Sequence, residues 1–92
     1  MAKKKKIKVD GGAFDSVEAF HEYMRRVLVE LDYKGNDLKA LENALLLADE
    51  PVRLIIENKE AMIETLGDYA KRFDVLLHEA ATANPNFTFK YK

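Results

Sequence analysis

The sequence predicts a single α/β domain, a small three-stranded parallel sheet packed by about four helices in the order β-α-α-β-α-α-β. Two kinds of apolar spacing alternate along its 92 residues. Short runs have the alternating or continuous apolar character of strands, and longer stretches have the three- and four-residue spacing of helices. Strands separated by helices normally pair in parallel through right-handed crossovers, so this order favours a parallel sheet.

The first strand and the first helix follow from the amino-terminal third. Residues 7–9 (IKV) alternate apolar and charged side chains, and the DGG at 10–12 ends this strand. Asp15 followed by Glu18 is typical of a helix N-cap with its capping-box partner. The helix that follows has one apolar face, formed by Val17, Phe20, His21, Met24, Val27, Leu28 and Leu31.

A second helix is predicted after a turn at Gly35. Asp37 is placed to cap it, and Leu38, Leu41 and Leu45 recur at the spacing of a buried stripe. Two helices in a row before the next strand are what the β-α-α-β order requires.

The remaining elements repeat this order. After Pro51, the continuous apolar run at 52–56 (VRLII) is typical of a strand covered on both faces. A short helix is predicted near 59–66, and Gly67 ends it before another helix begins at Asp68. That last helix has a buried stripe of Tyr69, Phe73, Leu76, Leu77 and Ala80. The NPN at 84–86 breaks it, and the alternating 87–91 (FTFKY) forms the last strand.

Composition limits the classes of protein. The chain has no cysteine, which excludes disulfides and thiolate metal sites and favours a cytoplasmic location. No apolar run approaches the roughly 20 residues of a membrane span, so no membrane partner is expected. We expect residues 1–6 to form a basic flank and 7–92 a single domain, a monomer in solution.

The lysines at 3–6 have two possible interpretations. A lysine run before a short strand is usually a solvated flank that keeps the strand from pairing with another chain. The alternative is a nucleic-acid-binding arm, but neither arginine nor aromatic residues are interleaved with the lysines. Without these four lysines the formal charge falls from −1 to −5, so the body is acidic and no nucleic-acid partner is expected.

Catalytic patterns are absent from the sequence. It contains no GxGxxG, GxxxxGK[ST], HExxH or GxSxG motif. His21 falls within an apolar stripe, where a packed, hydrogen-bonded histidine is more common than a base or a ligand. His78 lies next to Glu79, but adjacent helix residues do not face each other. We therefore expect no enzyme, no cofactor and no metal site.

Several stretches together resemble the barstar family of bacterial ribonuclease inhibitors along nearly the whole chain. They are VDGGAFDSVEAFHEYMRRVL at 9–28, the Y-x-G-x-x-L-x-A-L frame at 33–41, Pro51, Phe73 with Glu79-Ala80, and the last strand. The alignment needs about one deletion, between the second helix and Pro51. Each residue is ordinary by itself, so the resemblance depends on their order and spacing.

The resemblance implies an intracellular inhibitor or toxin-immunity protein that occludes the active site of a secreted ribonuclease or related toxin. Members of the family insert the second helix, the loop before it and one glutamate of the last helix into a cleft lined with cations. By position, the partner-binding residues implied here are Tyr33, Gly35, Asn36, Lys39, Glu42, Asn43 and Glu79. Because Glu79 falls outside the buried stripe, we expect it to be exposed.

Three of these positions depart from the family pattern. The resemblance implies a carboxylate where this chain has Lys39 and another where it has Asn43, with an aromatic residue where it has Glu42. Three hypotheses follow: an inhibitor whose partner has a different surface; a barstar-like scaffold, drifted or engineered, without ribonuclease-inhibiting activity; and, least favoured by the motifs, a small enzyme or nucleic-acid binder.

Overall fold

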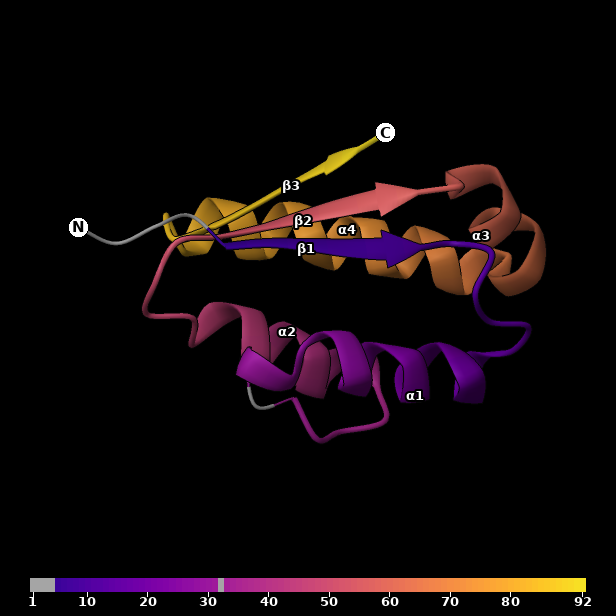
Figure 1. Cartoon of the computed structure of the whole chain (residues 1–92), viewed down its shortest axis with the longest axis horizontal. Helices are drawn as coiled ribbons and strands as arrows, with labels where there is room; N and C mark the ends of the chain where they lie inside the picture. The colour runs from indigo at the N-terminus through magenta and orange to yellow at the C-terminus, as the bar shows by residue number, and fades with distance from the viewer. Residues whose placement is uncertain (1–4, 32) are drawn as a thin grey trace.

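The computed structural model describes residues 5–31 and 33–92, except for the side chain of Glu30. The predicted order of strands and helices is confirmed (Figure 1). The elements are β1 (Lys5–Asp10), α1 (Val17–Val27), a 3-10 turn η1 (Val29–Leu31), α2 (Leu38–Leu46), β2 (Val52–Glu57), α3 (Lys59–Leu66), α4 (Asp68–Ala83) and β3 (Phe87–Tyr91). Strand β1 begins two residues inside the expected basic flank, whose Lys3 and Lys4 lie outside the described residues.

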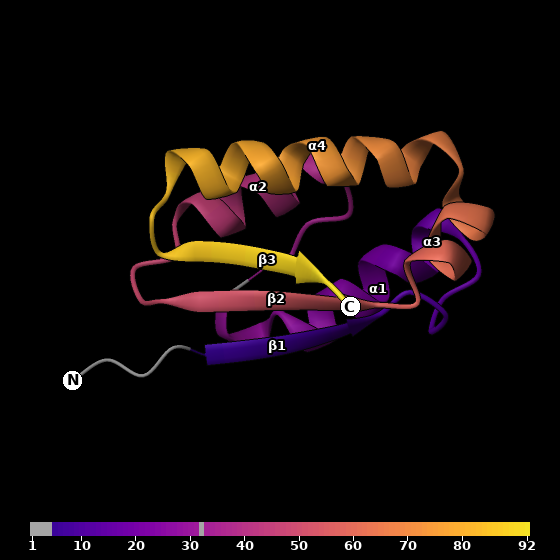
Figure 2. The ribbon, with the colours of Figure 1, turned by 90° about the horizontal axis from the view of Figure 1, so that it is seen from above.

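The sheet is parallel throughout, as predicted, with β2 between β1 and β3. Its register aligns Lys5, Val52 and Phe87 in one row, and every second row after it has the same orientation because side chains alternate along a strand. Figure 2 looks onto the sheet with α1 and α2 behind it. The helices therefore pack on one face and leave the other open.

This open face corrects the expectation that 52–56 is covered on both faces. Leu54 and Ile56 belong to the hydrophobic core, whereas Ile55 is buried but outside the core cluster. Its neighbours in the same row are Lys8 and Lys90, and lysines commonly cover apolar neighbours with their aliphatic stems. A continuous apolar run cannot distinguish burial beneath helices from burial between long side chains.

Helix α1 begins and ends differently from the prediction. Its N-cap is Ser16, not Asp15: Ser16 has extended backbone angles directly before the first helical turn, and its Oγ accepts from the Ala19 N–H at 3.1 Å. The helix ends at Val27, and η1 carries the chain onward to Leu31. Most of the predicted apolar face packs inward, with Phe20, His21, Met24 and Leu28 buried, but its first member, Val17, is exposed.

The other helix boundaries agree with the prediction. Asp37 caps α2, accepting from the Ala40 N–H at 2.8 Å, and Leu41 and Leu45 are in the core. Gly67 separates α3 from α4 with φ of +57°, a conformation that L-residues with a side chain seldom adopt. Helix α4 packs against both α2 and β3, so it forms one wall beside α2.

Candidate functional site

The loop before α2 is held in place by a close backbone approach and by an arginine. A Cβ on Gly35 would lie 2.2 Å from the Ala40 Cβ, so only glycine fits there without a shift of the loop. Arg25 of α1 donates from Nη1 to the Gly35 carbonyl oxygen at 2.9 Å. Together with the Asp37 cap, these contacts fix the entry into α2.

His21 is a buried hydrogen-bonding centre beneath this loop, as the sequence analysis expected. It is 1% exposed; its Nδ1 lies 2.6 Å from the Tyr33 hydroxyl, and its Nε2 is hydrogen-bonded to the Tyr69 hydroxyl. A neutral imidazole satisfies both contacts, donating from one nitrogen and accepting at the other. The centre thus ties α1, the loop and α4 together.

Burial dominates the electrostatics of this centre. It lowers the pKa of His21, an effect that Asp37 opposes and Arg25 reinforces. It also raises the pKa of Tyr33 to about 12 and that of Tyr69 above its usual range. All three groups are therefore neutral near pH 7. Because His21 is buried and both of its ring nitrogens are hydrogen-bonded to tyrosines, it serves as a packing and positioning residue.

The other end of α2 is held by a residue that the sequence analysis treated only as part of a helix breaker. Asn84 is buried, and its Nδ2 donates to the carbonyl oxygens of Leu45, Leu46 and Ala48 at 3.0, 3.2 and 3.0 Å. Its Oδ1 accepts from the Asn86 N–H at 3.0 Å. Carbonyls at a helix end have no donor within the helix, and Asn84 supplies donors to three carbonyls here. The Ala48 N–H also donates to the Leu45 oxygen, and the Asn86 Nδ2 donates to the Ala48 oxygen.

A groove of about 340 Å³ runs between α2 and α4. It is lined by Leu38, Lys39 and Glu42 of α2 and by Lys71, Arg72, Val75, Leu76 and Glu79 of α4. The α4 residues at 72, 75, 76 and 79 have the spacing of one helical face. This spacing is the sequence signal that could have predicted the α4 side of the groove.

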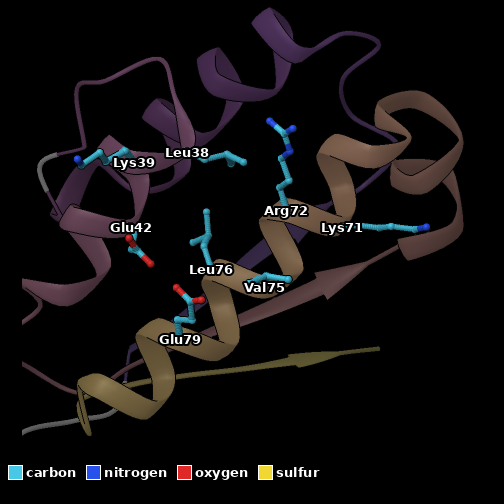
Figure 3. A pocket seen from close by; sticks show the side chains of 8 residues that line it. All are labelled: Leu38, Lys39, Glu42, Lys71, Arg72, Val75, Leu76 and Glu79. Atoms are coloured by element: carbon cyan, nitrogen blue, oxygen red, sulfur yellow. The ribbon is translucent and has the colours of Figure 1, made fainter.

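Three of the predicted site residues meet at this groove. In Figure 3 the carboxylates of Glu42 and Glu79 point toward the same opening between the helices, whereas Lys39 points away from it. Glu79 and Lys39 are exposed and Glu42 is half-buried. Two carboxylates from helices far apart in the sequence thus form an acidic mouth over the apolar floor of Leu38 and Leu76.

The other predicted residues lie on the opposite side of α2. Tyr33, Gly35 and Asn43 line a second, shallow depression of about 270 Å³ between the loop and the helix. Asn43 is exposed there, whereas Tyr33 is only 3% exposed. Tyr33 therefore supports the loop from beneath rather than offering a free side chain, and Asn36 is exposed in the loop itself.

The described part of the chain has neither a metal-ligand cluster nor a membrane-spanning helix. Within residues 5–31 and 33–92, no three His, Cys, Asp or Glu side chains gather as metal ligands would. Over the same residues, no helix is both long and apolar enough to cross a membrane. His78 is exposed, and its Nε2 lies 3.6 Å from Asp74 on the same helix.

A curated bacterial protein similar in sequence identifies the family of this chain. The chain is 34% identical over 77 residues to the protein named "Putative ribonuclease inhibitor YrdF" from Bacillus subtilis (strain 168), a match that spans 83% of this chain and 85% of that protein. The chain belongs to the barstar family. A scan against models of protein families finds no match. In the structure, the barstar-like frame at 33–41 corresponds to the first turn of α2 and the loop before it.

Proposed function

We propose that this protein inhibits a ribonuclease by placing α2 and the adjoining part of α4 over the enzyme's active site. Its family membership supports an inhibitor, and the fold presents the relevant surface. The loop is anchored at Gly35 and the far end of α2 at Asn84, so the surface is held before any partner arrives. A surface ordered in advance loses less conformational entropy on binding.

The observation that carries this proposal is the meeting of the Glu42 and Glu79 carboxylates at the mouth of the α2–α4 groove (Figure 3). A ribonuclease must hold RNA phosphates with cationic side chains. Carboxylates placed where phosphates bind compete with RNA for those cations and form charge-assisted hydrogen bonds with them. The exposed Val75 beside the acidic mouth adds an apolar contact at the rim.

Lys39 and Asn43 restrict which ribonuclease fits. Both are exposed on α2, where family members are expected to place carboxylates. Loss of one partner of a buried charge pair costs about 2–5 kcal/mol, so two independent losses cost about 4–10 kcal/mol. A nanomolar complex is worth only about 12 kcal/mol in total. The cognate enzyme therefore carries an acidic or neutral group opposite Lys39 rather than a uniformly cationic cleft.

A second candidate function is a barstar-like scaffold without ribonuclease-inhibiting activity. The observation that favours it is the replacement of both central acids, one of them by an exposed lysine that would repel a cationic cleft. The two candidates share the fold and differ only in whether the α2–α4 surface has a ribonuclease partner.

The contribution of α4 can be tested in a background with the central acids restored. The variant Lys39→Asp/Asn43→Asp should inhibit RNA cleavage by a barnase-type ribonuclease, and adding Glu79→Gln should weaken that inhibition about 30- to 4,000-fold, the equivalent of 2–5 kcal/mol. Glu64→Gln on the exposed side of α3 removes the same charge away from the groove and should change nothing. Equal inhibition constants for the two added substitutions would exclude α4 from the interface.

A further inference from the structure

The open face of the sheet is a second surface, separate from the groove. The rows that point away from the helices contain Lys6, Arg53 and Thr88, then Lys8, Ile55 and Lys90. Lys6, Lys8 and Lys90 are exposed and Arg53 is half-buried. Figure 2 views the three strands from this side, with no helix drawn over them. The outward rows of the sheet thus present four cations on a surface that no helix covers.

These four cations lie close together and lack intramolecular ion pairs. Alternate residues along a strand are about 6.6 Å apart and neighbouring strands about 4.8 Å apart, so the two rows fit within one small patch. Among the described residues, none of the four has an acidic side chain within ion-pair distance. Arg53 has one neutral contact, from its Nε to the Thr88 Oγ1 at 3.5 Å.

The acidic residues of the same face lie at the carboxyl end of the strands. Asp10 and Glu57 form the next outward row. Asp10 is already engaged, because its Oδ1 accepts from the Gly12 N–H at 2.9 Å and from the Asn58 Nδ2 at 2.8 Å. The face therefore has a cationic half and an acidic end, although the whole chain has a formal charge of −1. The expectation of no nucleic-acid partner used the net charge and counted Lys6 in a flank, whereas Lys6 lies in β1 on this face.

We propose that the cationic half of the open sheet face, hereafter the sheet-face cations Lys6, Lys8, Arg53 and Lys90, docks the phosphate backbone of single-stranded RNA. Unpaired lysine and arginine side chains on a flat surface are complementary to closely spaced phosphates. The preference for RNA over DNA rests on the proposed function, in which the partner enzyme acts on RNA. The docking itself stands on the charge pattern alone.

A protein partner fits this face less well. The cores of protein interfaces are depleted in lysine and need apolar anchors, whereas the central Ile55 is already buried by its neighbours. No aromatic ring belongs to the outward rows, because Phe87, Phe89 and Tyr91 lie in the inward ones. Base stacking is therefore absent, and binding depends on phosphates and salt rather than on base sequence.

The α2–α4 groove and the sheet-face cations can be occupied at the same time because they lie on different sides of the molecule. The α2–α4 groove lies among the helices, while the sheet-face cations lie on the side that the helices leave open (Figure 2). RNA on the sheet does not compete with a ribonuclease at the groove. A failure of one proposal therefore leaves the other intact.

The test is fluorescence anisotropy of a labelled uridine-rich oligoribonucleotide titrated with the full chain at several salt concentrations. Four phosphate contacts give a slope of log K against log salt of about −2.8, a loss of about 50-fold between 50 and 200 mM salt. Lys8→Gln/Lys90→Gln should make this slope shallower by about 1.4. The control Arg26→Gln/Lys59→Gln removes the same charge from exposed positions away from the open sheet face and the groove, and it should keep the slope.

Three outcomes would overturn the proposal. No binding at 50 mM salt, or an equal loss in both double variants, would exclude a localised site on the sheet. Tighter binding of polyglutamate than of the oligoribonucleotide would assign the face to an acidic protein. Equal affinity for a deoxyribonucleotide of the same sequence would overturn RNA as the specific occupant. Thermal unfolding of both variants checks that each remains folded.

Discussion

Asn84 should be a principal stabilising residue outside the apolar core, because it holds the end of α2 against the turn after α4. Replacing it with alanine removes the Nδ2 donor to Leu45, Leu46 and Ala48 and the Oδ1 acceptor for Asn86. The amide has two N–H groups to share among three carbonyls, so the change removes about three hydrogen bonds. At about 1 kcal/mol each, Asn84→Ala should lower the free energy of unfolding by about 3 kcal/mol.

In a domain of this size, 3 kcal/mol corresponds to a fall in Tm of about 12–24 °C. Circular dichroism during heating and urea titration would measure both quantities. Asn86→Ala is the matched control, since its Nδ2 makes a single bond to the Ala48 carbonyl oxygen at 3.2 Å and its side chain is half-buried. It should cost about 1 kcal/mol. If Asn84→Ala cost no more than this control, the anchoring of α2 by Asn84 would be wrong.

Three further predictions follow from burial and charge. Phe73→Ala should lower the free energy of unfolding by about 3–5 kcal/mol, because Phe73 is fully buried; a loss below 1 kcal/mol would contradict the core assignment. Burial lowers the pKa of folded His21, so the unfolded chain binds more protons and stability should decline as pH falls below about 6.5, a dependence that His21→Gln should remove from urea titrations. Lys39→Asp/Asn43→Asp should change stability by no more than about 0.5 kcal/mol, since both residues are exposed; a large loss would make them structural.

The elements of the fold were predictable because each has its own spacing and boundary residues. Asp37 and Gly67 mark helix ends by chemistry that acts within a few residues. The N-cap of α1 was placed one residue early because Asp15 and Ser16 both have side chains suited to capping. In the structure Ser16 is the residue with extended backbone directly before the first helical turn, and its side chain accepts from the Ala19 N–H.

The sequence predicted a set of candidate site residues but not which of them lie together on one surface. The resemblance grouped Glu42 and Asn43 as neighbours on α2, but packing against α4 places Glu42 in the groove and leaves Asn43 on the other side. The anchoring role of Asn84 depends on contacts with residues 36 to 39 positions away in the sequence. The open sheet face likewise appears only when the register aligns Lys8 with Ile55.

We propose that α2 keeps the position of a ribonuclease-inhibiting helix while Lys39 and Asn43 change its choice of partner. The most direct measurement compares inhibition of a barnase-type ribonuclease by the unmodified chain and by Lys39→Asp/Asn43→Asp. We predict that only the double variant inhibits RNA cleavage at nanomolar concentration. Nanomolar inhibition by the unmodified chain would contradict the charge argument, and absence of inhibition by both would remove the support for α2 as the inhibitory surface.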